Sequence, residues 1–530
     1  MSTRDGPSGG PSSHLARDSA VVGAATVLSR LLGFVRDILI ARMLGAGPVA
    51  DAFLVAFRLP NLFRRVLGEG GLNAPFVPLY LQIKADHGEA GARRFAGEAA
   101  ASFGVALAVL AALTELIAPW LVLAIAGGFR DAPMTFALAE SYTRLALPFL
   151  AFTTLASLLA AILNAERRFA IAALAPVLLN VVMISALFFI EIKGLSPPQG
   201  AKTLAIAVSL GGAAHLAMIA LALMLGRPGF PPLRLRWTPD LTRLIVLGVP
   251  ALLAAATSQL VLLVATQIAS VQPGAVSWLY YADRVFQLPL GFVAVAMGVV
   301  LLPEIAASEA AHDAQGRRST VDRALVLGLA FAVPAAVALV LLAEPIISIL
   351  FERGKFGAID RERTSAALAA FAIGLPFAVA AKVFAQVFFA RQVPRIALYA
   401  GITSLLVAAV VGHMLVRNEP ATGAALAASL AFATQMSVLV FFLLRQRLWH
   451  LSAMAARKIA GIILASLAMA MVLSALMMAL EGWLAHDAAA LRRIAALVLL
   501  CAGGLVSYAI CARLFGAFRM RELDEFRHRH

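Results

Sequence analysis

About fourteen apolar stretches, most of them near the 20 residues that cross a bilayer as a helix, limit what this chain can fold into. Helices are favoured because every backbone polar group must be satisfied within the membrane. Charged residues form 14% of the 530-residue chain, against about 25% in a soluble domain. We therefore expect an all-α integral membrane protein. The stretches lie near 19–44, 49–67, 97–120, 134–162, 171–191, 202–225, 243–270, 278–303, 323–350, 364–390, 396–416, 421–444, 458–480 and 494–516, with Pro60 and Pro289 interrupting the second and eighth.

The formal net charge of +15 comes mainly from basic residues in short loops between these stretches. They concentrate in the loops of one side, as the positive-inside rule describes for cytoplasmic loops. This pattern explains the charge without a nucleic-acid partner and places both termini in the cytoplasm. The two cysteines, Cys501 and Cys511, lie in the last apolar stretch and indicate free thiols, with no metal site and no cofactor.

Three short motifs recur with nearly constant separation. The first two pairs are separated by 227 residues (274 − 47 and 354 − 127), and the third by 228 (376 − 148). The pairs are Gly47-x-Val49 with Gly274-x-Val276, Gly127-Gly-Phe129 with Gly354-Lys-Phe356, and Leu147-Pro148-Phe149 with Leu375-Pro376-Phe377.

This offset covers six stretches, so the two halves would have the same orientation in the membrane. Parallel repeats of this kind occur in transporters that rock one half against the other. We expect two six-helix lobes, at 19–226 and 243–446, with two extra helices at 457–516. Residues 1–18, rich in Ser, Gly and Pro, and residues 517–530 are expected to form cytoplasmic tails, the first of them disordered.

Charged side chains inside the apolar stretches are the main functional signal, because each costs roughly 2.5–3.5 kcal/mol at the centre of a membrane helix. Arginine suits a diphosphate, since its planar guanidinium binds two oxygens and keeps its charge. We therefore predict a wet cationic cavity that holds an anion. The residues concerned are Arg30, Arg36, Asp37, Asp51, Arg58 and Arg64 in the first half, and Asp283, Arg284 and Lys382 in the second, with Ser29 beside Arg30.

Two pairs of opposite charges are neighbours in sequence, Arg36 with Asp37 and Asp283 with Arg284. Adjacent residues do not face each other on a helix, so we expect each member to contact a different partner. The alternative is a set of buried ion pairs that locks the helices together.

Several motifs resemble the MurJ (MviN) family of lipid II flippases, within the multidrug/oligosaccharidyl-lipid/polysaccharide exporter superfamily. The resemblance covers the chain from about residue 19 to its end and implies fourteen helices around a central cationic cavity. It implies diphosphate-binding roles for Arg30, Arg36, Arg64 and Arg284, and a groove for the polyprenyl tail between the last two helices. The motifs are Ser29-Arg-Leu-Leu-Gly-Phe-Val-Arg36-Asp37, Asp51-Ala-Phe, Leu59-Pro-Asn-Leu-Phe-Arg-Arg65, Ala74-Pro-Phe-Val-Pro78, Trp278-Leu-Tyr-Tyr-Ala-Asp-Arg284 and Gly354-Lys-Phe356.

The function that this resemblance implies is transport of lipid II across the bacterial inner membrane by alternating access, with no bond made or broken. Membrane lipids and the peptidoglycan synthesis machinery are the further partners it implies. One departure is Gln287, where family members can carry an acid one turn after the arginine of the eighth segment. Two alternatives are a transporter of the same superfamily for another polyprenyl-linked saccharide, and a membrane transferase. The transferase would need an acidic metal cluster, which the sequence lacks.

Overall fold

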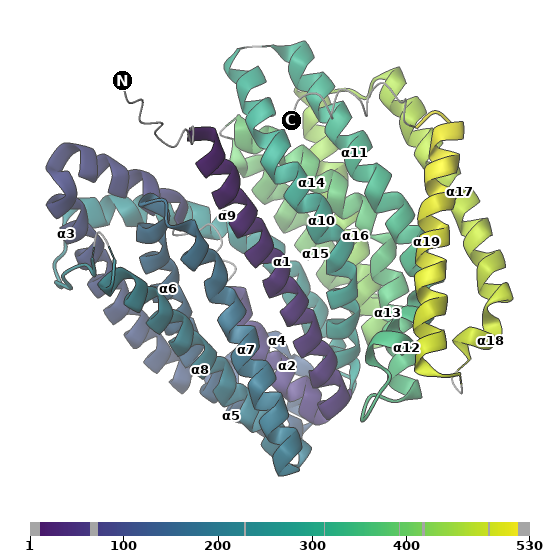
Figure 1. The fold of residues 1–530 in the computed structure, drawn as a ribbon, viewed down its shortest axis with the longest axis horizontal. Helices are drawn as coiled ribbons and strands as arrows, with labels where there is room; N and C mark the ends of the chain where they lie inside the picture. Colours follow the sequence, from purple (N-terminus) through teal and green to yellow (C-terminus); the bar gives the residue numbers. More distant parts are fainter. Residues whose placement is uncertain are drawn as a thin grey trace, which may run out of the picture. The chain divides into compact units, whose positions relative to one another are not determined.

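The computed structural model describes residues 11–63, 73–226, 229–311, 313–391, 393–415, 419–485 and 488–517. All regular elements within these ranges are helices, which confirms the predicted all-α class (Figure 1). The chain divides into two compact units. Unit 1 comprises Met1–Leu44, Pro48–Ala124 and Ala132–Ala256, and unit 2 comprises Gly45–Gly47, Ile125–Asp131 and Thr257–His530.

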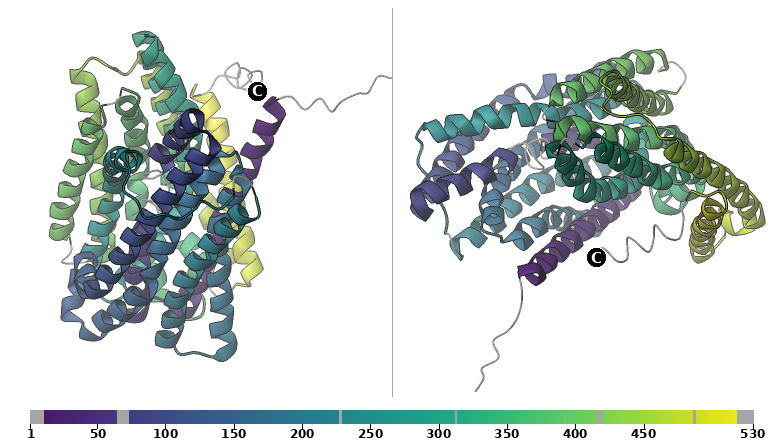
Figure 2. Two further views of the ribbon diagram at one scale, coloured as in Figure 1. Left: turned by 90° about the vertical axis from the view of Figure 1, so that its left-hand side faces the viewer. Right: turned by 90° about the horizontal axis from the view of Figure 1, so that it is seen from above.

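Unit 1 is built around α8, which packs against α5, α6 and α7. Helix α1 lies against α7, and α3 lies against α6 (Figure 2, left). The aromatic residues Phe76, Tyr80 and Phe95 are buried in the core between α3 and α6. The helices are α1 (Pro11–Leu44), α2 (Pro48–Phe63), α3 (Asn73–Leu116), α4 (Ala118–Ile125), α5 (Pro133–Ala146), α6 (Pro148–Ala165), α7 (Phe169–Lys193), α8 (Pro197–Met224) and the first part of α9 (Pro239–Ala269).

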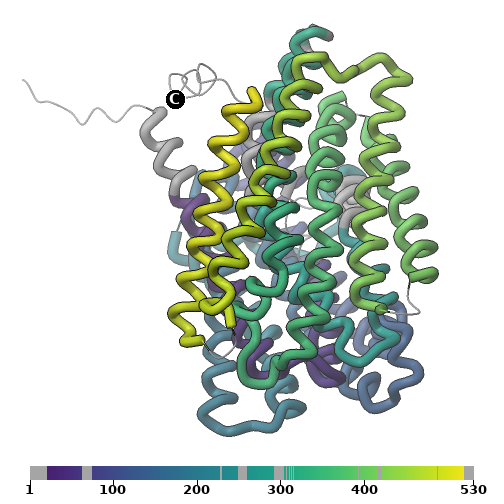
Figure 3. The backbone as a smooth tube through the Cα atoms, turned by 90° about the vertical axis from the view of Figure 1, so that its right-hand side faces the viewer, coloured from purple at the N-terminus to yellow at the C-terminus, as the bar shows by residue number. Residues whose placement is uncertain are grey.

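Unit 2 is built around α16 in the same way, with α13, α14 and α15 packed against it. The C-terminal helices α17 and α19 lie side by side, and α17 also contacts α11 (Figure 3). The elements are the 3₁₀ helix η2 (Gly127–Asp131), the end of α9, α10 (Ala275–Ala310), α11 (Ala314–Leu341), α12 (Ala343–Phe351), α13 (Ala358–Ile373), α14 (Leu375–Ala390), α15 (Pro394–Leu415), α16 (Pro420–Arg445), α17 (Ala453–Ala479), α18 (Glu481–Leu484) and α19 (Ala490–Leu514).

The helices follow the repeat found in the sequence. Helix α2 begins at Pro48 and α10 at Ala275, a separation of 227 (275 − 48), and α6 and α14 begin at Pro148 and Leu375 with the same separation (375 − 148). Packing is also equivalent inside each unit, since α3–α6, α5–α8, α6–α8 and α7–α8 correspond to α11–α14, α13–α16, α14–α16 and α15–α16. The division into two six-helix lobes and a C-terminal pair remains a prediction.

Nine of the helical stretches in the described part of the chain are long and apolar enough to cross a membrane, or ten if α13 and α14, bent by 40°, form one span. They confirm a multi-pass membrane protein. Each of the fourteen predicted segments overlaps a helix or two consecutive helices. The count of fourteen spans stays a prediction, because α1, α2, α9 and α10 are outside this set. The nine are 75–116, 133–165, 169–193, 197–224, 315–341, 394–415, 420–445, 453–479 and 490–514.

Helix boundaries correct two expectations. Helix α1 begins at Pro11, so residues 11–18, expected in a disordered tail, are helical. Helices α2 and α10 continue through Pro60 and Pro289, so the predicted interruptions are wrong. Proline is tolerated in membrane helices where side chains compensate for the lost backbone bond. In α2 the side chain of the next residue, Asn61, donates to the Phe57 carbonyl oxygen at 3.0 Å, a contact beside the Ala56 carbonyl that Pro60 cannot pair.

Candidate functional site

Arg36 lies in the last third of α1 and is buried against α7 and α2. Its Nη1 donates to Asn180 Oδ1 at 2.8 Å and lies 4.0 Å from Met183 Sδ. The guanidinium carbon lies 5.0 Å from the centre of the Phe57 ring, within the range of a cation–π contact. Three elements of unit 1 therefore enclose this cation.

The interpretation that Arg36 and Asp37 point to different partners is wrong. Arg36 Nε and Nη2 donate to Asp37 Oδ1 at 2.9 and 2.7 Å, and the two side chains are only 7% and 1% exposed. Neighbouring residues point about 100° apart around a helix. The arginine side chain is nevertheless long enough to fold back and contact Asp37. In this conformation the charge of Arg36 is balanced inside unit 1, as the alternative of a buried ion pair requires.

Ser29 and Arg30 lie two turns before Arg36 on α1, in a different environment. Asn180 Nδ2 donates to the Ser29 carbonyl oxygen at 2.9 Å, so one amide links both ends of this stretch of α1. The Arg30 side chain is exposed, and within the part of the chain that the structure describes it makes no hydrogen bond or ion pair. Arg30 is therefore available to a ligand in a way that Arg36 is not.

Helix α2 carries Asp51 in its first turn, where the side chain is fully buried. An acid at this position is favourable because the first turn of a helix has a partial positive charge. Arg58, in the second half of α2, is half-buried. Arg64 lies outside the described residues.

In α10 the neighbours Asp283 and Arg284 do have different partners, as predicted. Gln287 Nε2 donates to Asp283 Oδ2 at 2.5 Å, and the Arg284 guanidinium carbon lies 4.5 Å from the centre of the Tyr280 ring. Asp283 is buried and Arg284 is half-buried. The amide of Gln287, one turn after Asp283 on α10, therefore contacts this buried carboxylate. Lys382 is exposed on α14.

The structure thus brings together Arg36, Asp37 and the backbone of Ser29, and Asn180 joins them. Sequence reasoning missed Asn180, although a polar side chain inside an otherwise apolar segment was a usable signal. It also missed the ring contacts of Phe57 and Tyr280, for which the sequence offers no signal, because an aromatic residue in an apolar helix usually packs in the core.

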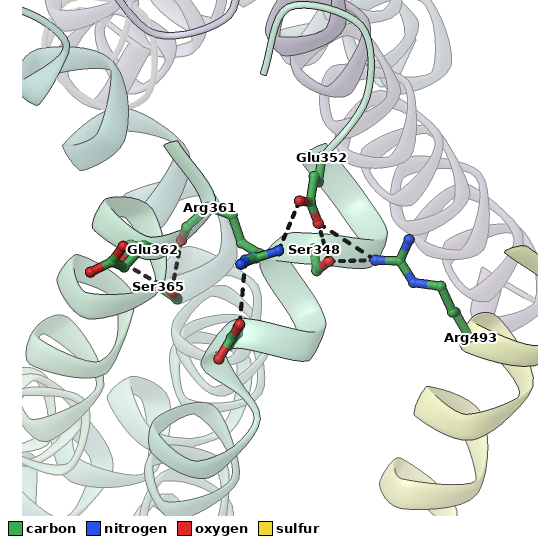
Figure 4. Close-up of polar contacts among 7 residues, drawn as sticks. Ser348, Glu352, Arg361, Glu362, Ser365 and Arg493 are labelled. Carbon is green, nitrogen blue, oxygen red and sulfur yellow. Dashed lines mark hydrogen bonds and ion pairs between the residues drawn. The ribbon is translucent and has the colours of Figure 1, made fainter. Parts of the chain in front are cut away.

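A second polar cluster lies in unit 2, where α12, α13 and α19 meet (Figure 4). Glu352 accepts a hydrogen bond from Arg361 Nη1 at 2.8 Å, and its other oxygen lies 3.6 Å from Arg493 Nη2. Ser348 donates to Glu352 and accepts from Arg493. We call Ser348, Glu352, Arg361 and Arg493 the anchor cluster. It joins the first turn of α19 to α12 and α13.

One arginine of the anchor cluster belongs to a segment that is unusually rich in cations. Residues 351–363 carry four cations on the side predicted to be outside, against the positive-inside trend. Two of them are neutralised by carboxylates in the structure, Arg361 by Glu352 and Arg363 by Glu419. The positive charge of this segment is therefore partly compensated by carboxylates.

The fold defines the protein as a multi-pass, all-helical membrane protein. The structure matches that of an inward-facing multidrug resistance MATE family transporter of the MOP superfamily with a TM-score of 0.66, over 81% of this chain and 98% of that chain at 16% identity. It matches a structure described as lipid II flippase MurJ in an inward closed conformation with a TM-score of 0.77, over 94% of this chain and 98% of that chain at 23% identity.

The sequence comparisons then identify the family. The family model for lipid II flippase MurJ matches residues 40–491. A probable lipid II flippase MurJ from Rhizobium meliloti (strain 1021) is 41% identical over 396 residues, 73% of each chain. Lipid II flippase MurJ from Burkholderia cenocepacia is 36% identical over 384 residues, 72% of this chain and 74% of the relative. The chain belongs to the lipid II flippase MurJ family.

Proposed function

We propose that this protein is a lipid II flippase, which moves the lipid-linked peptidoglycan precursor from the cytoplasmic to the outer leaflet of the bacterial inner membrane. The observation that carries the proposal is the family match over residues 40–491, which includes helices of both repeats. The movement is transport, so the protein makes or breaks no bond in its cargo.

The cargo has a diphosphate between an apolar tail and a polar sugar, and its capture calls for cations at membrane depth. Arg30 supports this role because it is exposed in the second half of a long helix and has no ion-pair partner among the described residues. Arg284 supports it because its half-buried guanidinium is stacked on Tyr280, a contact that orients the group. We assign diphosphate binding to Arg30 and Arg284, and extend it to Arg64 from the family resemblance.

Arg36 has a conditional role in this proposal. It must release Asp37 or Asn180 before it can bind a phosphate with both arms of its guanidinium. In the conformation described it fastens α1 to α7, and we place its contact with the cargo in a later step of an alternating-access cycle. Asp37, Asp51, Asp283 and Lys382 are assigned supporting roles, because they balance or extend the charge of the arginines.

The remaining parts of the proposal concern the lipid tail and the surroundings. The helices within 457–516 are the proposed groove for the polyprenyl chain, since α17 and α19 expose many large apolar side chains. We place both termini in the cytoplasm from the distribution of basic residues in the loops. The machinery that polymerises peptidoglycan is the proposed consumer of the exported precursor.

Depletion of the protein in its native bacterium tests the proposal. Total lipid II and the fraction that reacts with a membrane-impermeant probe at the outer leaflet are measured together. We expect the total to be kept or to rise while the outer fraction falls. An unchanged outer fraction would refute the proposal. Accumulation of a different polyprenyl-linked saccharide, with normal exposure of lipid II, would establish the alternative cargo.

A further inference from the structure

The segment 229–238 between α8 and α9 is neither helix nor strand, and it exposes an unusual sequence. Leu233, Leu235 and Trp237 are 58%, 70% and 69% exposed. Arg234 and Arg236, which alternate with them, are exposed as well. Three large apolar side chains in water would be unfavourable, because burial of each stabilises by about 1.5–3 kcal/mol. Their surroundings therefore need an explanation.

The segment is fixed to the side of α3 at three points. Arg93 Nη2 donates to the Phe230 carbonyl oxygen at 3.2 Å, and Thr238 Oγ1 donates to Glu98 Oε2 at 3.3 Å. Between them, a Cβ at Gly97 would lie 2.0 Å from the Pro232 carbonyl oxygen, so only glycine allows this approach. These contacts lie within unit 1.

The contacts also fix the depth of the segment along α3. Residues 93–98 of α3 include three charges, whereas residues 99–114 have none. Because a helix rises 1.5 Å per residue, Gly97 and Glu98 lie about 3 Å or less from the first residue of this uncharged run. The segment 229–238 therefore crosses α3 at the level where the helix passes from its polar part into its apolar part.

We propose that residues 229–238 form an interfacial strap that binds the surface of an anionic bilayer. Leu233, Leu235 and Trp237 would insert at the boundary between headgroups and acyl chains, where tryptophan is enriched in membrane proteins. Arg234 and Arg236 would bind lipid phosphates, since basic side chains beside a membrane are attracted to its negative surface. The strap would keep unit 1 at a fixed height in the membrane. This inference concerns the bilayer and does not depend on the cargo.

Depth-resolved quenching of Trp237 in the full chain tests the strap. The protein has five tryptophans, and the other four are replaced by phenylalanine. The protein is placed in vesicles of phosphatidylcholine with phosphatidylglycerol, with bromine on the lipid chains either near the headgroup or near the chain end. We expect stronger quenching by the shallow bromines and protection from aqueous iodide. Quenching by iodide with none from either lipid would overturn the proposal.

A second variant keeps the test decisive if the single-tryptophan protein does not fold. Trp237→Cys in a chain without its native cysteines carries an environment-sensitive fluorophore. After reconstitution into the same vesicles, its emission is expected to be that of an interfacial environment. Emission that stays as in water would overturn the proposal.

The arginines are tested by the double variant Arg234→Gln/Arg236→Gln, with Arg130→Gln, an exposed cation elsewhere, as the matched control. The readout is the enrichment of phosphatidylglycerol over phosphatidylcholine around Trp237. We expect the double variant to lower it by about fivefold or more, since one basic residue near an anionic surface contributes about that factor. The control should leave it unchanged. Equal enrichment in all three proteins would refute the role of the arginines.

Discussion

Removal of Arg36 tests whether the buried pair with Asp37 stabilises α1 against α7. Arg36→Ala takes away the cation that contacts Asp37, Asn180 and Phe57, while Asp37 stays only 1% exposed. Loss of one partner from a buried pair costs about 3–5 kcal/mol, because the other charge is left without compensation. We expect about 3 kcal/mol, the lower end, since Asp37 has a further interaction.

The assay compares membrane abundance and the midpoint of heat-induced aggregation of the detergent-solubilised protein. The double variant Arg36→Ala/Asp37→Leu, which removes both charges, should recover most of the lost stability, because replacement of a buried pair by apolar residues is often neutral. Wild-type abundance and midpoint in Arg36→Ala alone would refute the reasoning. They would mean that the Arg36–Asp37 pair does not stabilise the fold, and that Arg36 acts only on the cargo.

The remaining predictions concern Arg30, the anchor cluster and the topology. Arg30→Ala should keep normal abundance, because substitutions at exposed sites usually change the free energy of unfolding by about 0.5 kcal/mol or less. It should abolish outer-leaflet exposure of lipid II. Growth like the wild type would refute a role for Arg30. Arg493→Ala should lower the aggregation midpoint by loosening α19, whereas Arg363→Ala, in a more exposed pair, should change it little; equal effects would argue against a special role of the cluster. In a chain without its native cysteines, cysteine at Gly357 should react with an impermeant thiol reagent from outside, and cysteine at Gln446 should not. The reverse pattern would invert the proposed orientation.

Much of the fold was predictable, since apolar runs of about 20 residues have few conformations open to them in a membrane. The breaks inside these runs were less predictable. The segment 134–162 separates into α5 and α6 at Leu147, and 323–350 separates into α11 and α12 at Leu342. Pro148 follows the first break, but Pro60 and Pro289 cause none. Whether a proline breaks a helix depends on the groups around it, which the local sequence does not contain.

For the charged residues too, the sequence identified the unusual positions, and the packing of the helices decided their partners. The sequence identified Arg30, Arg36 and Arg284 as exceptional, because an arginine in an apolar segment is costly wherever it points. It did not distinguish exposed Arg30 from buried Arg36, since the partner of Arg36 on α7 comes 144 residues later in the chain. The same holds for Glu352 and Arg493, which are brought together by the packing of α12 against α19.

The sequence by itself therefore determined the class, the positions of the apolar segments, the repeat and the residues whose burial would be expensive. These depend on composition and periodicity, and hence on transfer free energies that act residue by residue. Tertiary structure alone decided which of the cations are neutralised. A side chain's partner depends on how helices far apart in the sequence are rotated and packed, and a difference of a few ångströms determines whether a guanidinium meets a carboxylate or remains open to a ligand.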